Sequence, residues 1–343
     1  MSRFASTLVD WQRRHGRKGL PWQASTDPYR VWLSEVMLQQ TQVSAVIPYY
    51  ERFLQRFPTV GALAAASEDE VLQLWSGLGY YARGRNLHAA AQLISKQGFP
   101  KTADEIAELP GVGRSTAAAI AAFSFGERAA ILDGNVKRVL ARHAGIAGFP
   151  GDKKVEAKLW ALAESLLPKK SIEIYTQALM DLGATVCTKG KPRCDACPVS
   201  QACVARKKGL TGSLPAPRPK KAVPSRSTTW LVLRYGGQVL LERRPSPGIW
   251  GGLWSFPEAN GKDIARDCRN LGYRVSSMRE LDEIEHGFTH FRLTIQPVLC
   301  EVSELASAVA SPGRLWIDLA EAGSAATPAP VKKLLHTFTR RVA

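Results

Sequence analysis

The stretch LPGVGRSTAAAIAAFSFGERAAILDGN, residues 109–135, constrains the fold of this chain more than any other segment. Pro110, Gly111 and Gly113 favour a tight turn, because glycine adopts positive φ freely and lets another group approach its backbone. A helix after the turn would add the positive end of its dipole to the free N–H groups of the turn. The pattern therefore predicts a helical hairpin that can hold a phosphate group.

The positive charge of the chain is concentrated in its first part. Lys and Arg outnumber Asp and Glu by 46 to 30. The net charge is +14 over residues 1–226 and +2 over residues 227–343. A polyanion is the natural partner of such a region, and a basic surface that only aids solubility is the alternative. The longest apolar run, Ala117–Phe123, is far shorter than the ~20 residues that span a membrane. We expect a soluble cytoplasmic protein without a membrane partner.

Four of the six cysteines fall in one short segment with the spacing C-x6-C-x2-C-x5-C. Gly, Pro, Lys and Arg fill the gaps, so we expect neither helix nor strand there, and such a loop needs a crosslink. In a reducing cell that crosslink is a metal, while two disulfides or free thiols are the alternative. Four thiolates suit zinc or an iron–sulfur cluster, and coordination chemistry does not separate the two. The four are Cys187, Cys194, Cys197 and Cys203.

Composition divides the chain into two domains. We expect a mainly helical domain over residues 1–206, including the cysteine loop 187–203. A Pro-, Lys- and Arg-rich linker follows over 207–226, and an α+β domain covers 227–343. The predicted helices are Tyr29–Val43, Glu68–Leu74, Ala82–Gln97, Ser115–Phe123, Val136–His143, Lys154–Leu167, Ile172–Leu182, Lys262–Leu271 and Val331–Arg340. The predicted strands are Thr228–Tyr235, Gln238–Arg244, Ile284–Phe288, Arg292–Val302 and Arg314–Asp318.

Two carboxylates stand where acid chemistry could occur. Glu35 shares a helix face with Val31, Trp32 and Leu38, so it points inward among apolar groups. A half-buried carboxyl keeps its proton to higher pH and can act as a general acid; a core-edge glutamate paired with an arginine is the alternative. Asp133 precedes a helix and could simply be its cap, although Asn135 could equally be that cap. Paired carboxylates also hydrolyse glycosidic bonds, one as acid and one as support for the oxocarbenium ion.

The motifs LPGVGRST and ILDGN, together with the four-cysteine loop, resemble the helix–hairpin–helix DNA glycosylases that carry an iron–sulfur cluster. Within that group, SEVMLQQTQV, GLGYYARGRNL and the further domain after Cys203 are similar to the adenine DNA glycosylases of the MutY type. The resemblance implies one 4Fe-4S cluster on the four cysteines, with zinc as the alternative. It also implies a double-stranded DNA partner that contains adenine opposite 8-oxoguanine or guanine, bound by a monomer.

The resemblance further implies roles for the candidate catalytic residues. Glu35 would protonate the adenine ring at N7, and Asp133 would stabilise the oxocarbenium ion. Asn135 and Ser115 would help to hold this site. Ser115 stands where the endonuclease III type carries a lysine, and a serine hydroxyl cannot form an imine. We therefore expect hydrolysis by water that leaves an intact abasic strand.

Other positions match residues that contact DNA or the base in that family. Gly111 and Gly113 would form the phosphate-binding turn. The wedge positions are Tyr80, with packing beside Trp75 as the alternative, and Gln42. The adenine-pocket positions are Lys18, Trp22 and Asp181.

The second domain contains LERRPSPGIWGGLWSFPE, which resembles the Nudix fold. The stretch DIARDCRNLGY lacks the run of glutamates with which a Nudix hydrolase holds magnesium, so we expect a binding module. The Phe-Ser-His loop of the family, which reads 8-oxoguanine, appears here as Phe288, Thr289 and His290. Threonine keeps the hydroxyl and adds a methyl group. A strand-edge threonine beside a surface histidine is the alternative.

Two other functions compete with a monofunctional adenine glycosylase. One is a bifunctional glycosylase/lyase for pyrimidine lesions, against which Ser115 argues. The other is a DNA-damage sensor without enzymatic activity, which would need the phosphate-binding turn but no acid at Glu35.

Overall fold

The structure is a computed structural model that describes residues 3–219, 222–261, 263–288, 290–305 and 313–339. The chain forms two compact units. Unit 1 comprises Met1–Ala65 and Asn86–Lys220, and unit 2 comprises Ala66–Arg85 and Lys221–Ala343. The domain boundaries expected from composition stay a prediction. Within the described residues, no helix combines the length and the apolar character needed to cross a bilayer.

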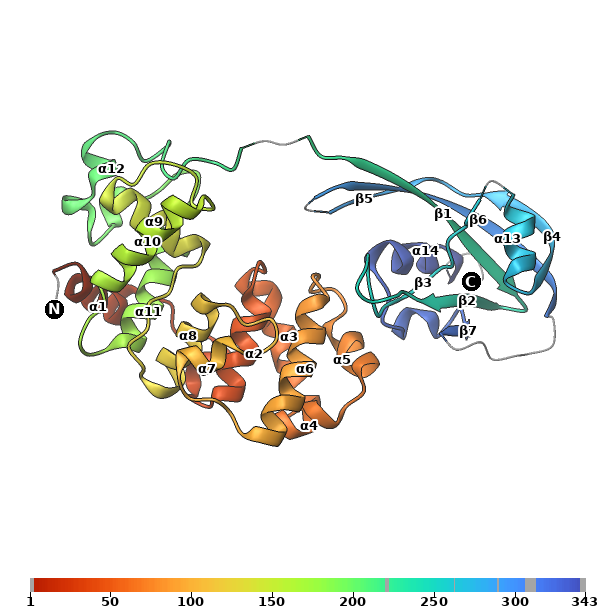
Figure 1. Ribbon diagram of the computed structural model, residues 1–343, viewed down its shortest axis with the longest axis horizontal. Coiled ribbons are helices and arrows are strands. Elements are labelled where there is room, and N and C mark those ends of the chain that lie inside the picture. Colours follow the sequence, from red (N-terminus) through yellow and green to blue (C-terminus); the bar gives the residue numbers. More distant parts are fainter. Residues whose placement is uncertain (1–2, 220–221, 262, 289, 306–312, 340–343) are drawn as a thin grey trace. The chain divides into compact units, whose positions relative to one another are not determined.

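Unit 1 is a helical domain, coloured red to green in Figure 1. Helices α1, α8, α9, α10 and α11 enclose one of its apolar clusters, which includes Leu8, Leu140, Leu159 and Tyr175. Aspartate caps begin several helices, as Asp152 does at α10. The helices are α1 (Arg3–His15), α2 (Pro28–Leu38), α3 (Val43–Arg56), α4 (Val60–Ala65), α6 (Ala82–Gln97), α7 (Ala103–Ala107), α8 (Arg114–Phe125), α9 (Gly134–Ala144), α10 (Lys153–Ser165), α11 (Ile172–Asp181) and α12 (Val204–Lys207).

The turn between α7 and α8 has the conformation that its glycines predict. Gly111 adopts φ +76°, and a Cβ at this position would lie 2.7 Å from the Cβ of Asn86. Gly113 is the N-cap of α8 with φ −90°, and a Cβ there would meet nothing. Gly111 is thus required by conformation and packing, whereas Gly113 keeps the N-terminus of α8 uncovered.

Several predictions for unit 1 were wrong in detail. The single helix expected over Tyr29–Val43 is broken, because α2 ends at Leu38 and Gln40 adopts φ +58° before α3 begins. Helix α3 was not predicted; it contains Pro48. Helix α1 was also not predicted. The cysteine loop, expected to lack helices, contains two single-turn 3-10 helices, Cys194–Ala196 and Ser200–Ala202.

Unit 2 contains a mixed sheet with the strand order β3-β2-β1-β6-β4. Two more strands belong to it: β5 pairs with β6, and β7 pairs with β2. Strands β1 and β6 run parallel in the register Thr228↔Ile295, and the other pairs are antiparallel. Strand β4 was not predicted from sequence. The strands are β1 (Ser225–Tyr235), β2 (Gln238–Arg243), β3 (Trp254–Ser255), β4 (Tyr273–Glu280), β5 (Ile284–Gly287), β6 (Arg292–Leu305) and β7 (Arg314–Asp318).

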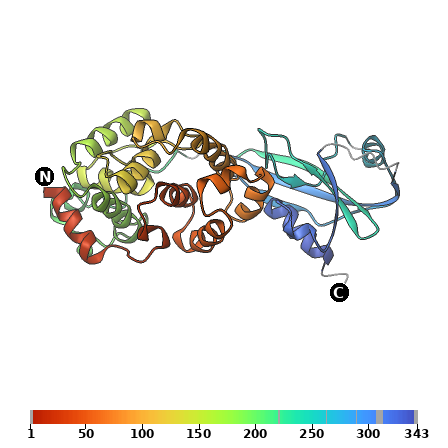
Figure 2. The ribbon, with the colours of Figure 1, turned by 90° about the horizontal axis from the view of Figure 1, so that it is seen from below.

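Helices cover both faces of this sheet, as Figures 1 and 2 show. Helix α14 (Ala329–Thr339) packs on the face that carries Trp230 and Val232, and α13 (Ile264–Asn270) packs on the face that carries Leu231 and Leu233. Helix α5 (Glu68–Trp75) belongs to the same unit and adds Leu72 to the core beneath α14. The fold class is therefore the predicted one: a helical helix–hairpin–helix domain and a Nudix-like α+β domain.

Candidate active site

A cavity of about 430 Å³ opens in unit 1, within the range of roughly 300–1,000 Å³ that ligand pockets occupy. Three of the predicted site residues line it: Lys18, Trp22 and Glu35. The indole of Trp22 is fixed by an edge contact with Tyr50, at 5.5 Å between ring centroids. The lining also includes residues from α1, α8 and α11 that sequence did not single out, namely Gln12, Phe123, Glu173, Ile174 and Gln177.

Glu35 projects from α2 into this cavity and has an unusual acidity. Burial is the main cause that raises its pKa to about 8, and the negative charge of Asp133 raises it further. No cation offsets these two effects within the described part of the chain, so the arginine-paired alternative does not hold there. Glu35 is consequently a carboxylic acid at neutral pH and can donate a proton.

Asp133 is both a helix cap and a charged neighbour of Glu35. Its carboxylate accepts the Val136 N–H at 2.7 Å, which makes it the N-cap of α9. Burial raises its pKa, while hydrogen bonds from Val136 and Asn135 and the charge of Arg138 act in the opposite direction. The net shift of the Asp133 pKa is upward, but these hydrogen bonds and the nearby guanidinium favour its anion, whereas both effects on Glu35 favour its neutral form. Asp133 lies outside the lining of the cavity itself.

Ser115 fixes the segment that carries Asp133. Its hydroxyl oxygen accepts the Leu132 N–H at 2.8 Å, immediately before the aspartate. The first turn of α8 is thereby tied to the chain that enters α9. Ser115 thus positions the aspartate, and it does not line the cavity.

Arg138 is a residue of this site that sequence reasoning missed. Its guanidinium donates to Asn135 Oδ1 at 2.8 Å, and also to the carbonyl oxygens of Gly183 and Cys187, each at 2.7 Å. It therefore connects Asn135, two residues after Asp133, with Cys187, the first cysteine of the four-cysteine loop. The available signal was its position one helical turn after Asn135, on the same face of α9.

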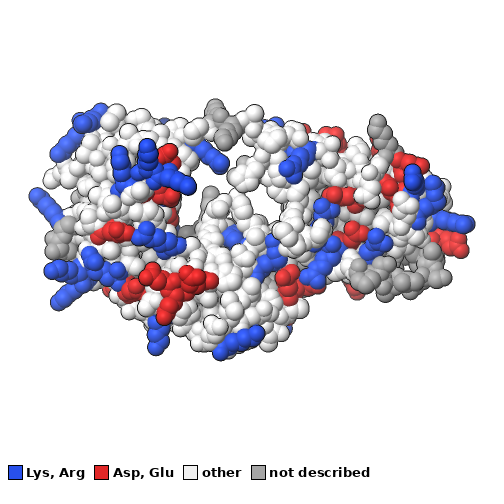
Figure 3. Space-filling view, in the orientation of Figure 1, with Lys and Arg blue, Asp and Glu red and all other residues white. Residues whose placement is uncertain are grey.

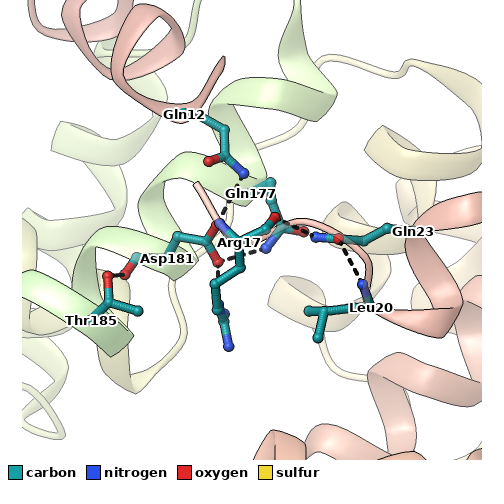
Figure 4. A network of polar contacts seen from close by, with 7 residues as sticks. All are labelled: Gln12, Arg17, Leu20, Gln23, Gln177, Asp181 and Thr185. Atoms are coloured by element: carbon teal, nitrogen blue, oxygen red, sulfur yellow. Dashed lines mark hydrogen bonds and ion pairs between the residues drawn. The ribbon is translucent and has the colours of Figure 1, made fainter. Parts of the chain in front are cut away.

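Asp181 does not line the cavity but organises its wall, as Figure 4 shows. The fully buried carboxylate accepts both the backbone N–H of Arg17, at 2.8 Å, and its Nε, at 2.7 Å. Gln12 and Gln177 each donate a side-chain N–H to it, at 3.0 and 2.9 Å. Gln23 donates to the carbonyl of Arg17 at 3.2 Å. One buried anion therefore holds α1, α11 and the loop that leads to Trp22.

We expect Asp181→Asn to destabilise unit 1 by about 2–4 kcal/mol, because the amide NH2 would oppose two of the four donors and Arg17 would lose its counter-charge. Chemistry in the cavity should slow as well, since Gln12, Arg17 and Gln177 all line it. Thermal denaturation and a single-turnover activity assay measure the two effects. Glu164→Gln, which removes the exposed partner of Arg114, is the control and should change stability by less than about 1 kcal/mol.

The four cysteines of the loop line one small cavity together, as expected of a shared ligand set. Arg142 donates to Cys187 Sγ at 3.4 Å and to the carbonyls of Thr188, Lys189 and Leu214, so a buried cation fixes the loop beside the thiols. No three His, Cys, Asp or Glu side chains among the described residues are arranged to hold a single metal ion. Four thiols around one cavity are a donor set that suits zinc or an iron–sulfur cluster.

The predicted DNA-contacting residues are exposed at separate points of the two units. Gln42 is exposed at the start of α3. Tyr80, in unit 2, is 51% exposed with φ +48°, and the guanidinium of Arg83 lies over its ring and that of Trp75. Lys18 donates to the Arg13 carbonyl. On the face of unit 1 in Figure 3, Lys and Arg gather over α9 and α10, where the exposed lysines include Lys153, Lys154 and Lys158.

The predicted lesion-reading loop connects β5 and β6 in unit 2. Phe288 is partly buried and His290 is exposed. Thr289 lies outside the described residues.

Comparisons with known proteins agree with this architecture. Residues 33–165 match the HhH-GPD superfamily of base excision DNA repair proteins, and residues 229–337 match the NUDIX domain. The structure of a thermostable thymine-DNA glycosylase is 28% identical, with a TM-score of 0.54, and covers 60% of this chain and 95% of its own. The helical unit is thus that of a base excision repair glycosylase.

Two curated relatives narrow the class. The adenine DNA glycosylase of Buchnera aphidicola subsp. Acyrthosiphon pisum is 36% identical over 99% of this chain and 98% of its own length. The human adenine DNA glycosylase is 34% identical over 98% of this chain and 74% of its own length. The chain belongs to the adenine DNA glycosylase family.

Proposed function

We propose that this chain is a monofunctional DNA N-glycosylase that removes adenine paired with 8-oxoguanine or guanine, in base excision repair. The observation that supports it best is the pair of Glu35 and Asp133. Burial and the charge of Asp133 raise the pKa of Glu35 to about 8, while hydrogen bonds from Val136 and Asn135 and the charge of Arg138 favour the anion of Asp133 against its own burial. Glycosidic bond hydrolysis uses this combination of an acid and an anion.

The reaction begins when adenine leaves the base stack and enters the cavity between Trp22 and Glu35, because the bond is shielded inside the duplex. Glu35 donates its proton to the ring, which makes adenine a better leaving group. As the bond breaks, positive charge develops on the sugar, and the anion of Asp133 stabilises it. Water then adds to the sugar carbon. Ser115 cannot form an imine, so the strand stays intact.

The other site residues support this reaction. Ser115, Asn135 and Arg138 hold Asp133 in place, and Asp181 holds the wall that Lys18 and Trp22 share. The turn at Gly111 and Gly113 presents backbone N–H groups and the N-terminus of α8 to a phosphate. We propose Gln42 and Tyr80 as wedge residues, since both are exposed and an aromatic ring offsets lost base stacking.

In unit 2, the loop of Phe288, Thr289 and His290 would read 8-oxoguanine. Asp267, the one carboxylate of α13, accepts the N–H groups of Asn260 and Gly261 and so has a structural partner. This supports a binding module over a magnesium-dependent hydrolase. The partner would be double-stranded DNA, bound by a monomer.

A duplex with one adenine opposite 8-oxoguanine tests the proposal. We expect base loss that yields strand breaks only after alkali. Strand cleavage without alkali, with borohydride trapping the protein on DNA, would instead indicate a lyase and contradict the assignment. Lys137, four residues after Asp133 in α9, is the lysine that could react with the aldehyde of the abasic sugar. Its ammonium group is paired with Glu156, which makes that reaction less favourable.

We further propose that Cys187, Cys194, Cys197 and Cys203 hold one 4Fe-4S cluster. When bound, the cluster would fix the loop and the basic surface around it. The purified protein should be coloured and contain about four iron atoms per chain. Cys197→Ser should lose both colour and iron, whereas Cys268→Ser, at a buried cysteine of unit 2, should keep them. A colourless protein with one zinc ion would contradict the cluster.

A further inference from the structure

The hairpin that connects β5 and β6 has a pair of stacked rings at its end. Gly287 pairs with Arg292 in the sheet, and the Phe288 N–H then donates to the Phe291 carbonyl at 2.8 Å. The rings of Phe288 and Phe291 are stacked, with 4.4 Å between centroids and 20° between planes. Backbone and side chains thus fix the two ends of the hairpin tip, which leaves His290 exposed between them.

The inner ring rests on further aromatic groups. Phe288 contacts Trp250 at 5.4 Å and His286 at 4.8 Å between centroids. Trp250 is 9% exposed and packs on Trp230 of the core. Trp250 also adopts φ +55°, which a tryptophan holds only where its surroundings impose it. The Phe288 ring is therefore connected to the core of unit 2.

The outer ring is covered as well. The guanidinium of Arg226 in β1 lies 4.7 Å from the centroid of Phe291. The Arg292 N–H donates to the Pro224 carbonyl at 2.9 Å, which ties the base of the hairpin to the chain before β1. The stack therefore continues from the exposed Arg226 through the two phenylalanines to Trp250. If the ring of Phe288 or Phe291 entered a DNA duplex, it would lose the contacts that it makes on both of its sides.

We propose that Phe288, Phe291 and Trp250 are positioning residues of the hairpin tip, and that none of their rings enters the DNA. They hold Phe288 and Phe291 in fixed positions at the two ends of the tip, so that the exposed His290 meets the base opposite adenine. 8-Oxoguanine differs from guanine by one carbonyl oxygen and by a proton on N7, so only correctly placed hydrogen-bonding groups can tell the two apart. The inference rests on the proposed recognition of 8-oxoguanine.

Phe291→Leu tests the stack, because leucine keeps apolar volume but removes the ring. The dissociation constant is measured for two duplexes in which a 2′-fluoro adenosine that resists cleavage stands opposite 8-oxoguanine or guanine. We expect the preference for 8-oxoguanine to fall about three- to tenfold, with guanine binding unchanged. Phe291→Tyr should keep the preference. Tyr273→Leu, which removes a ring from the Tyr273–Trp316 pair, is the control and should leave it unchanged.

Each remaining outcome has one meaning. An unchanged preference in a folded Phe291→Leu protein would overturn the inference. Phe288→Leu should also lose only the preference for 8-oxoguanine, with its affinity for the guanine duplex unchanged. An equal loss of affinity for both duplexes would show instead that the Phe288 ring stacks on DNA bases. If Phe291→Leu does not fold, Arg226→Gln tests the stack from its exposed side, with the same two outcomes. Equal binding of both duplexes by the wild type would refute the proposed lesion preference itself.

Discussion

Glu35→Gln is expected to lower the single-turnover rate of adenine release by roughly 10²–10⁴-fold, the usual contribution of a general acid. Glutamine keeps the size of the side chain but cannot donate the required proton. DNA binding should change little, since the amide fills the same space beside Trp22. The rate is measured on a duplex with adenine opposite 8-oxoguanine.

Glu173→Gln is the matched control for this change, because Glu173 is the other carboxyl that lines the cavity but is exposed at the start of α11. We expect its rate to stay within about threefold of wild type. Wild-type rates in Glu35→Gln would remove Glu35 from the mechanism and favour a damage sensor or another acid.

The Glu35→Gln variant, although less active, should be more stable than the wild type at neutral pH. The folded-state pKa of Glu35 is about 8, against an ordinary glutamate value of 4.5, so the folded state binds more protons between these two pH values. Stability contributed by protonated Glu35 is therefore lost as pH rises through this window. Glu35→Gln should stabilise the protein on the order of 2 kcal/mol at neutral pH, with little difference near pH ~4. Thermal melts at several pH values would contradict this if the difference did not grow with pH.

Asp133→Asn is expected to reduce the rate by about 10²–10³-fold with little loss of stability. Asparagine is also a good N-cap, so its side-chain oxygen can still accept the Val136 N–H. What disappears is the negative charge that stabilises the sugar cation. Single-turnover rates and thermal melts separate the chemical role from the capping role.

Asp152→Asn provides the comparison, since Asp152 caps α10 by accepting the N–H groups of Lys154 and Val155. It should leave the rate unchanged. If Asp133→Asn were as active as Asp152→Asn, Asp133 would be a cap without a catalytic role.

Local patterns in the sequence identified the parts of the site that local structure creates. The turn at Gly111 follows from backbone sterics, and the position of Asp133 before a helix predicted its cap. The apolar neighbours of Glu35 on one helix face predicted its inward orientation. Each of these inferences uses residues within about one or two helical turns.

The rest of the site depends on contacts between distant segments. Asp181 meets Gln12 and Arg17 across more than 160 residues, so no spacing rule could show that it organises the cavity wall. The break between α2 and α3 arises from positive φ at Gln40, and glutamine is not a residue from which a turn of this kind is predicted. The contact of helix α5 with the core of unit 2 is likewise a matter of tertiary packing.

The central claim is that Glu35 and Asp133 act on the same nucleotide as acid and anion. The most direct test is the pH dependence of single-turnover adenine release, from about pH 6 to about pH 9, for wild type and Asp133→Asn. We predict that the wild-type rate falls as pH rises through about 8. In Asp133→Asn the rate should begin to fall at a lower pH, because the charge that raises the pKa of Glu35 is gone. A rate that rises with pH, or a fall at the same pH in both proteins, would contradict the account.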